Sequence, residues 1–267
     1  MIFTEAVDTV RPGVRPGNGG WQADIGEDWL QGRTAFGGLQ TALAIRALRQ
    51  QVPDGLPLRV AQTTFMAPVP AGPVRLDARI LRTGKSAVHG ECRIAAGDQT
   101  LCMVMAIFGS SRTSGLRLSP APADIPDNGD PKREFRYVQG ISPSFAQHFV
   151  MRWSRGDRLF SGSTQTFTSI HVRHRDPQPL DETHVIALAD TVPSPGLSML
   201  SKPAMASSLT WTLELLDHRF DYPHDAFWRM DTEVTAGGDG YLAQSAHLWN
   251  PDGRLAALSR QSVVVFG

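Results

Sequence analysis

Three polar side chains stand at positions where the surrounding pattern is apolar, and a carboxylate, a carboxamide and a hydroxyl are groups that can take part in acid–base and hydrogen-bonding chemistry. Asp190 follows the apolar run THVIALA, so its carboxylate lies at the end of a buried segment. Gln261 shares a strand face with apolar residues and must find hydrogen-bond partners, or else cost about 1 to 3 kcal/mol. Ser208 begins another strand, and Thr210 offers a second hydroxyl on it. Taken singly, each residue is better explained by a structural role: Asp190 as a cap or in an ion pair, Gln261 bonded to backbone, and Ser208 at a strand edge.

A pair of glycines, Gly37 and Gly38, opens the segment 37–52, which is predicted to be a helix. Its first turns are small or apolar on most of the circumference, which is typical of a helix that a curved sheet surrounds. Because glycine has no side chain, a sheet or a ligand can approach the helix start, where unpaired N–H groups collect. These groups are candidates for binding substrate and stabilising an oxyanion, and tight packing is the equally good alternative explanation.

Several other chemistries lack their motifs. The chain contains no G-x-S-x-G, so a nucleophilic serine of the α/β-hydrolase type has no candidate. The GKS at 84–86 lacks the glycine five residues earlier that a phosphate-binding loop needs, and no G-x-G-x-x-G opens a helix. His171 and His174 lie three apart in an alternating segment, where they face opposite sides. We therefore expect neither a metal nor another cofactor.

The composition is that of an ordinary folded protein without electrostatic bias. Of the 267 residues, 41% are hydrophobic, and 26 basic residues balance 26 acidic ones. A net charge of zero gives no reason to expect nucleic acid or an anionic membrane as a partner. The longest apolar runs are too short to cross a bilayer. The N-terminal residues lack a secretory pattern, and Cys92 and Cys102 are expected to be buried free thiols, so we expect a cytoplasmic location.

The chain divides into two halves at a proline-rich stretch. Between residues 110 and 144 the composition changes, with prolines at 120, 122, 126, 131 and 143, which disfavours both helix and central strand. We therefore expect an N-terminal domain at 1–112, a linker at 113–144 and a C-terminal domain at 145–267 that carries the catalytic residues.

Each half repeats the same order of elements. A helix region comes first, and four strand segments follow. Several of them alternate apolar and polar residues, as strands with one buried face do, whereas LCMVMAIFG at 101–109 is apolar on both faces, as in a central strand. The predicted strands are 58–65, 74–80, 88–94 and 101–109 in the first half, and 207–216, 227–234, 241–250 and 254–267 in the second. This order predicts an α+β fold in which a curved antiparallel sheet wraps around a central helix, twice over.

The sequence resembles the acyl-CoA thioesterase II family from about Trp21 to the C-terminus. The resemblance rests on FGG at 36–38, RVAQTTFMAPV at 59–69, the strand IHVRHRD, the apolar run that ends at Asp190 before the second helix, and PDGRLAALSRQ at 251–261. Members of this family consist of two fused hotdog folds. The resemblance therefore implies the same double hotdog fold and the hydrolysis of acyl-CoA to a carboxylic acid and coenzyme A.

The resemblance also implies roles for the polar residues. In the family an aspartate, a threonine or serine, and a glutamine hold the hydrolytic water, and these correspond to Asp190, Ser208 and Gln261. Strand parity leaves the direction of the Ser208 side chain open, so Thr210 is the alternative. An activated water can attack the thioester directly, so no covalent nucleophile is needed. The leaving thiol has a pKa of roughly 8.5 to 9, so it departs with little acid catalysis.

The expected partner is the acyl-CoA substrate, with Arg82 and Lys85 at a turn as candidates for contacting the coenzyme A phosphates. A non-catalytic acyl-CoA or lipid-binding protein is the alternative function, because the residues after Ser208 depart from the family pattern. A hotdog hydratase or dehydratase would need a D-x-N-x-x-H arrangement, which the sequence lacks. Exposed sheet edges allow further pairing, so a homodimer is possible.

Overall fold

The computed structural model describes residues 1–13, 20–116, 118–122, 124–125, 130 and 133–266. Part of the predicted linker, residues 117, 123, 126–129 and 131–132, lies outside the described residues, as does Gly267. The domain boundaries at 1–112, 113–144 and 145–267 therefore stay a prediction. No helix within the described ranges is long and apolar enough to cross a membrane.

The first half is a curved antiparallel layer of strands over one long helix, α2 (Gly37–Arg49), which is buried along most of its length. Side chains at alternating positions of β6 face this helix: Val74, Leu76 and Ala78 are buried. The predicted alternation is therefore confirmed. The strands are β1 (Arg11–Pro12), β2 (Gly20–Ile25), β5 (Leu58–Phe65), β6 (Gly72–Thr83), β7 (Ala87–Ala96) and β8 (Gln99–Gly109), in the spatial order β1-β2-β6-β7-β8-β5.

The second half repeats the arrangement around α3 (Glu182–Thr191), which the short helix α4 (Pro195–Met199) follows. The predicted repeat of a helix and four strands is confirmed, and β9 is an additional edge strand that the sequence pattern did not predict. The strands are β9 (Phe149–Arg155), β10 (Phe167–His174), β11 (Met205–Leu215), β12 (Trp228–Gly238), β13 (Tyr241–Trp249) and β14 (Leu255–Phe266), in the spatial order β11-β14-β13-β12-β10-β9.

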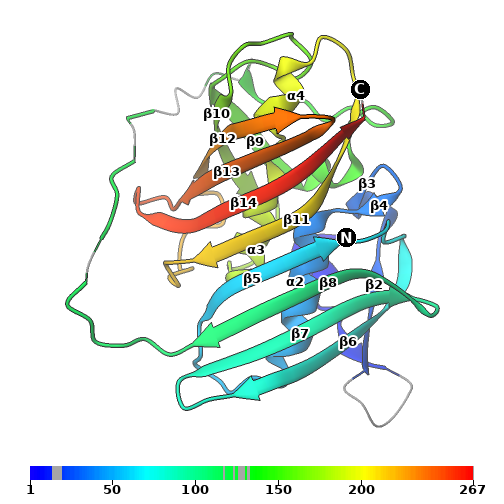
Figure 1. Ribbon diagram of the computed structural model, residues 1–267, viewed down its shortest axis with the longest axis vertical. Coiled ribbons are helices and arrows are strands. Elements are labelled where there is room, and N and C mark those ends of the chain that lie inside the picture. Colours follow the sequence, from blue (N-terminus) through cyan, green and yellow to red (C-terminus); the bar gives the residue numbers. More distant parts are fainter. Residues whose placement is uncertain (14–19, 117, 123, 126–129, 131–132, 267) are drawn as a thin grey trace.

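Strands β5 and β11 pair with each other and join the two halves. The pairing is antiparallel, with Thr63 opposite Trp211. The described residues thus form one continuous twelve-stranded sheet, whose two curved parts lie one above the other in Figure 1. Because a ladder of backbone hydrogen bonds crosses the join, the halves cannot separate without breaking it.

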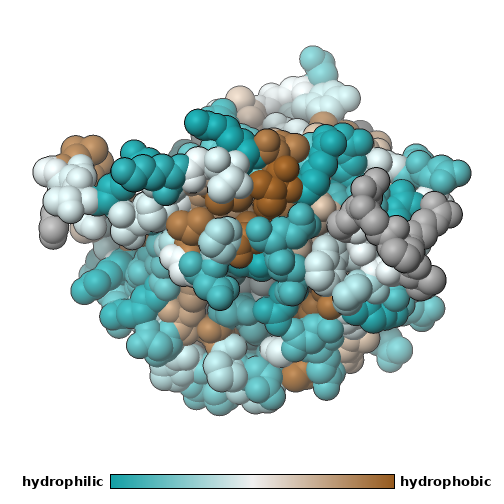
Figure 2. Space-filling model, turned by 90° about the horizontal axis from the view of Figure 1, so that it is seen from below, coloured by the Kyte–Doolittle hydropathy of each residue, from teal (hydrophilic) through white to brown (hydrophobic). Residues whose placement is uncertain are grey.

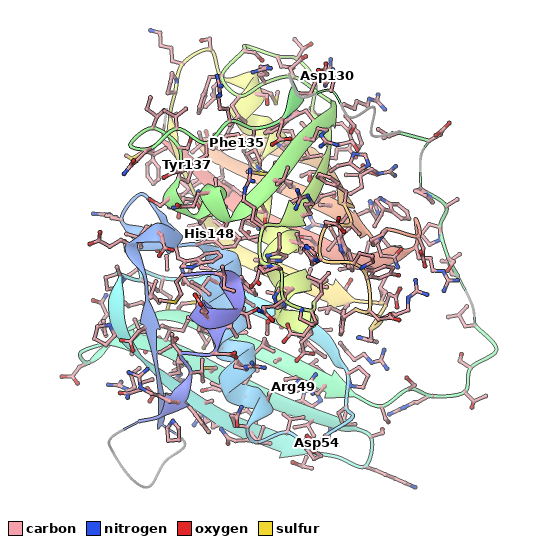
Figure 3. All side chains as sticks on the ribbon, turned by 180° about the vertical axis from the view of Figure 1, so that it is seen from behind. Arg49, Asp54, Asp130, Phe135, Tyr137 and His148 are labelled. Carbon is pink, nitrogen blue, oxygen red and sulfur yellow. The ribbon has the colours of Figure 1, made fainter. Side chains whose placement is uncertain are left out.

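The two central helices pack against each other in opposite directions. Near the start of α2, Gly38 lies against Ala187 of α3, and a Cβ at Gly38 would stand 3.0 Å from the Ala187 Cα. At the other end, Arg49 of α2 binds Glu182 of α3 through two contacts, Nε to Oε1 at 2.5 Å and Nη2 to Oε2 at 2.6 Å. Arg49, labelled in Figure 3, also lies 4.4 Å from the centre of the Phe108 ring.

The N-terminal residues cross over to the second half. In helix α1 (Phe3–Val7), Thr4 donates its N–H and its hydroxyl to Oδ2 of Asp176, each at 2.7 Å. Trp29 stacks on His148, labelled in Figure 3, with ring centres 4.0 Å apart. These contacts add to the strand pairing that joins the halves. The remaining short elements are η1 (Glu27–Trp29), β3 (Leu30–Gln31), β4 (Thr34–Ala35) and η3 (Ser144–His148).

Both cysteines are buried free thiols, as predicted. Burial raises the pKa of the Cys92 thiol and of the Cys102 thiol, so neither is a reactive thiolate. The surface differs from this interior: the face in Figure 2 is mostly hydrophilic, with small hydrophobic areas between the polar side chains.

Candidate active site

Asp190 lies in the last turn of helix α3, and not ahead of a second helix as the sequence predicted. The apolar run before it is itself the central helix of the second half. Asp181 caps the start of this helix, because its side chain accepts hydrogen bonds from the N–H groups of Thr183 and His184. The run was not recognised as a helix because a helix buried on most sides lacks the polar face that reveals the helical period.

The Asp190 carboxylate is half-buried and held by two donors. Nε2 of Gln261 donates to Oδ1 of Asp190 at 2.6 Å, and the Gly38 N–H donates to the same carboxylate. Burial raises the pKa of Asp190 to about 7, although both hydrogen bonds act to lower the pKa. A carboxylate with this pKa can both take and return a proton near neutral pH, as a general base must.

The two glycines bring α2 close to this carboxylate. A Cβ at Gly37 would stand 2.7 Å from Oδ2 of Asp190 and 3.0 Å from the Phe65 ring. The N–H of Gly38 donates its hydrogen bond to the Asp190 carboxylate, so in this structure it is not available to a substrate. Gly37 is the first residue of α2, and its N–H has no acceptor within the helix by virtue of that position. Binding of substrate by either glycine stays a prediction.

Gln261 lies on β14 and has a second partner that the sequence analysis missed. Gln244 on the neighbouring strand β13 is directly opposite Gln261, and its Nε2 donates to Oε1 of Gln261 at 2.8 Å. Both glutamines are buried. The signal that singled out Gln261, a polar residue on an otherwise apolar strand face, also applies to Gln244, which lies between Leu242 and Ala246 on the same face.

A β-bulge at Leu209 decides which way the two candidate hydroxyls point. On one side of the bulge Ser208 is opposite Val263, and on the other Thr210 is opposite Ser262. Val263 is buried on the same face as Gln261, whereas Ser262 is exposed on the outer face. Ser208 therefore shares the face of Gln261, and Thr210 does not. Among the described residues, neither hydroxyl forms a hydrogen bond with Asp190 or Gln261.

Arg82 and Lys85 are exposed at the turn between β6 and β7. This turn lies beside the end of β8, because the Ser86 carbonyl oxygen accepts from the N–H of Ser110. The end of β8 in turn pairs with the start of β5, where Phe108 is opposite Leu58. The glycines and Asp190 lie beside Phe65, at the far end of β5. A strand of that length spans about 23 Å, so the structure does not bring the two basic residues to Asp190 in the same chain.

The strand histidines face opposite sides of β10, as predicted. His171 is half-buried and its Nδ1 lies 2.6 Å from the Ser154 hydroxyl oxygen. His174 is buried, and its Nε2 lies 3.0 Å from the His184 carbonyl oxygen. Burial, with the nearby His184, lowers the pKa of His174 to about 3, so this side chain is a neutral part of the core.

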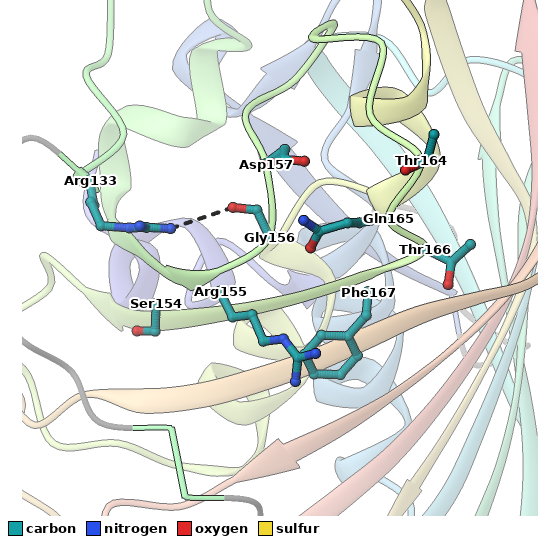
Figure 4. A pocket seen from close by; sticks show the side chains of 9 residues that line it. All are labelled: Arg133, Ser154, Arg155, Gly156, Asp157, Thr164, Gln165, Thr166 and Phe167. Carbon is teal, nitrogen blue, oxygen red and sulfur yellow. Dashed lines mark hydrogen bonds between the residues drawn. The ribbon is translucent and has the colours of Figure 1, made fainter.

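A separate groove of about 680 Å³ lies between β9 and the segment that leads into β10. Figure 4 shows its lining residues, with Arg133 donating to the Gly156 carbonyl oxygen at 3.4 Å. Asp190, Ser208 and Gln261 are not among the residues that line it. The groove is therefore distinct from the carboxylate site.

Comparisons with known proteins agree with the fold. The chain is 22% identical to a hotdog-fold protein of unknown function from Alicyclobacillus acidocaldarius, with a TM-score of 0.84 over 99% of this chain and 98% of that chain. It is 19% identical to a putative thioesterase II from Thermobifida fusca YX, with a TM-score of 0.80 over 99% and 97%. It is 13% identical to the TesB protein of Mycobacterium avium subs paratuberculosis, with a TM-score of 0.80 over 99% and 98%. At these identities the likeness shows the fold alone, and the double hotdog prediction is confirmed.

Family models extend the comparison to activity. No curated protein matches the sequence. The model of the acyl-CoA thioesterase N-terminal domain matches residues 25–109, and that of the acyl-CoA thioesterase C-terminal domain matches residues 122–265, which is more than half of the chain. The second match contains Asp190, Ser208 and Gln261, and the first contains the glycines that contact Asp190. The chain therefore belongs to the acyl-CoA thioesterase family and is a hydrolase of acyl-CoA thioesters.

Proposed function

We propose that Asp190 is the general base of thioester hydrolysis and that Gln261 and Ser208 orient the attacking water. The observation that carries this proposal is the hydrogen bond of 2.6 Å between Gln261 and a half-buried carboxylate whose pKa is about 7. Gln261 binds one carboxylate oxygen, and the buried surroundings raise the pKa so that the group can exchange a proton with water near neutral pH. Ser208 is on the face of the sheet that carries Gln261, which supports it over Thr210.

The proposed reaction needs no covalent intermediate. Asp190 takes a proton from water while the water oxygen bonds to the thioester carbonyl carbon, and the carbonyl oxygen becomes an oxyanion. The N–H of Gly37 at the start of α2 is the proposed donor to this oxyanion, because it has no acceptor within the helix and lies beside the carboxylate. When the carbon–sulfur bond breaks, the thiolate of coenzyme A leaves and the proton on Asp190 can neutralise it.

The proposed partner is an acyl-CoA, and the proposed location is the cytoplasm. The two buried, unpaired thiols support a reducing compartment. A homodimer through the sheet edges is a further proposal, supported by the open order of the sheet, which begins at β1 and ends at β9. Sedimentation at several protein concentrations tests the dimer, and a single monomer mass throughout would count against it.

The test of the proposed chemistry is release of free thiol from short, medium and long acyl-CoA substrates. Asp190→Asn removes the base while keeping the side-chain shape, and we expect kcat/KM to fall by about 10²- to 10⁴-fold. Asp54→Asn is the matched control, because Asp54 is exposed in the loop after the other end of α2, as Figure 3 shows. Undiminished turnover by the Asp190 variant would reject the proposed base. Binding without thiol release by the unchanged protein would favour the non-catalytic alternative.

A further inference from the structure

The side chain of Gln244 occupies an unusual place in the core of the second half. It lies on β13 directly opposite Gln261 on β14, and both side chains point to the inner face of the sheet. Gln244 is 5% exposed and Gln261 is 7% exposed. A buried glutamine carries two donors and an acceptor that must be satisfied, so an apolar residue would cost less at this position unless the amide has a task.

The task follows from the two ends of the Gln261 carboxamide. Its NH₂ group and its oxygen have nearly the same shape, so neighbours decide which of them faces Asp190. An ionised carboxylate only accepts hydrogen bonds, and it is stabilised when Nε2 faces it. A protonated Asp190 can instead donate its O–H to the oxygen of Gln261, which would face Asp190 if the amide turned over. With no other partner, the amide of Gln261 would therefore turn over as Asp190 gains and loses its proton.

Gln244 removes this freedom. Its Nε2 donates to Oε1 of Gln261 at 2.8 Å, which requires the oxygen of Gln261 to point toward β13 and its Nε2 to point toward Asp190. The hydrogen bonds thus run in one direction, from Gln244 to Gln261 to Asp190. Gln261 can then turn over only if Gln244 turns over with it, because otherwise the two oxygens would face each other.

In this orientation the remaining oxygen of Gln244, Oε1, is buried and is left without a hydrogen-bond partner among the residues that the structure describes. Leaving a buried acceptor unpaired is unfavourable, and the protein accepts this cost while keeping the donor of Gln244 on Gln261. This oxygen belongs to the residue paired with Gln261, which itself binds Asp190, so a water or a donor group of the substrate near the carboxylate site could satisfy it.

We propose that Gln244 is a positioning residue for thioester hydrolysis, because its side chain fixes the Gln261 carboxamide with the NH₂ group toward Asp190. This inference rests on the proposed role of Asp190 as the base. Gln244 itself does not touch the reacting atoms in this account. It keeps Gln261 bound to the ionised form of the carboxylate, which is the form that takes the proton from water.

Two substitutions of Gln244 test the orientation directly. Gln244→Met keeps the length and removes the donor, and we expect kcat to fall roughly 10- to 100-fold with little change in KM. Gln244→Glu keeps the shape, and in its ionised form at alkaline pH it only accepts, so under those conditions it should turn Gln261 over and reduce kcat further. In both variants the acid limb of the pH–rate profile should move to higher pH. Gln62→Met is the matched control, because Gln62 is exposed on the outer face of β5.

A double substitution separates positioning from simple packing. If Gln244 acts through Gln261, then adding Gln244→Met to Gln261→Met should change kcat and the pH profile no further. Thermal melts identify variants that fail to fold. If Gln244→Met does not fold, the test relies on Gln244→Glu. Unchanged kcat and pH profile in a folded Gln244 variant, or full additivity in the double variant, would overturn the inference. Activity retained by Asp190→Asn would instead overturn the proposed role of Asp190 as the base, on which this inference rests.

Discussion

Gly37 lies so close to Asp190 that a Cβ at the glycine would stand 2.7 Å from the carboxylate oxygen Oδ2. The glycine begins the central helix of the first half, and the aspartate lies in the last turn of the central helix of the second. The next residue, Gly38, donates its N–H to the same carboxylate. The carboxylate site is therefore assembled from both halves of the chain.

Gly37→Ala is expected to reduce activity more than stability. The new Cβ would meet the end of the Asp190 side chain, which can rotate away, and the helical position itself favours alanine over glycine. A displaced carboxylate loses its alignment with the water, so kcat/KM should fall roughly 10- to 100-fold while the melting temperature changes little. Thiol release and thermal melts on the same preparation measure both quantities.

Gly38→Ala provides the contrasting variant. Its Cβ would stand 3.0 Å from the Ala187 Cα and 2.6 Å from the Phe36 ring, and the helix backbone of α3 cannot move aside cheaply. We expect a loss of about 1 to 3 kcal/mol in the free energy of unfolding and a melting temperature lower by several degrees. Equal stability of the two alanine variants would show that the close approach of α2 and α3 is not needed.

The pH dependence of turnover should reflect Asp190. The proposed base works when it is ionised, and the pKa of Asp190 is about 7, so kcat/KM should rise with pH and level off above neutrality. Below the midpoint it should fall about tenfold per pH unit. Gln261→Met removes a donor that stabilises the ionised form, so the midpoint should move to higher pH. Loss of thioester absorbance at a series of pH values measures the profiles of the unchanged protein and of Gln261→Met. Identical midpoints in the two proteins would mean that Gln261 does not stabilise the ionised carboxylate of Asp190.

The same carboxylate predicts a pH-dependent stability difference. The pKa of Asp190 is raised to about 7 in the folded state, against about 3.9 for an unperturbed aspartate. Its contribution to stability is therefore fully present below the unfolded pKa and is lost as the pH rises through about 7. The amide that Asp190→Asn introduces cannot ionise, so this variant escapes the loss.

Accordingly, the melting temperature of Asp190→Asn minus that of the unchanged protein should increase from acidic toward mildly alkaline pH. Thermal melts at a series of buffered pH values measure this difference. The exposed Asp54→Asn variant should show no such trend. A difference that stays constant across the range would mean that the ionisation of Asp190 is not coupled to folding.

The bulge at Leu209 predicts different effects for two neighbouring hydroxyls. Ser208 shares the inner face with Gln261, so Ser208→Ala should lower kcat by about tenfold or more if its hydroxyl orients the water as proposed. Thr210 faces outward and is exposed, so Thr210→Ala should leave kcat within about twofold. Steady-state kinetics of both variants with one acyl-CoA decides between them, and the reverse order would reject Ser208.

The sequence pattern predicted the strands well because their alternation is local. Val74, Leu76 and Ala78 revealed the buried face of β6 without any knowledge of its neighbours. The pairing of β5 with β11 was not predicted, because it depends on contacts between residues such as Thr63 and Trp211 that are far apart in the chain. Patterns within one segment carry no information about which distant segment will lie beside it.

The candidate site was predicted in part for the same reason. Asp190 and Gln261 stood out as polar residues in apolar surroundings, and they are hydrogen-bonded across 71 residues of sequence. The side of the sheet that Ser208 occupies depended on a single bulged residue, which strict alternation cannot reveal. Gln244 carried the same signal as Gln261 but lies outside the segments that carry the family resemblance. Its place opposite Gln261 became visible only with the strand register.

The antiparallel helix pair has two ends, and they differ. At one end α2 begins against the half-buried carboxylate of Asp190, and at the other Arg49 closes the pair onto Glu182 with two short contacts. A duplicated architecture would offer two equivalent places for a reaction, but the ion pair fills one of them. Each polypeptide should therefore bind a single equivalent of a non-hydrolysable substrate analogue, as expected if the duplicated chain has one reaction centre at Asp190.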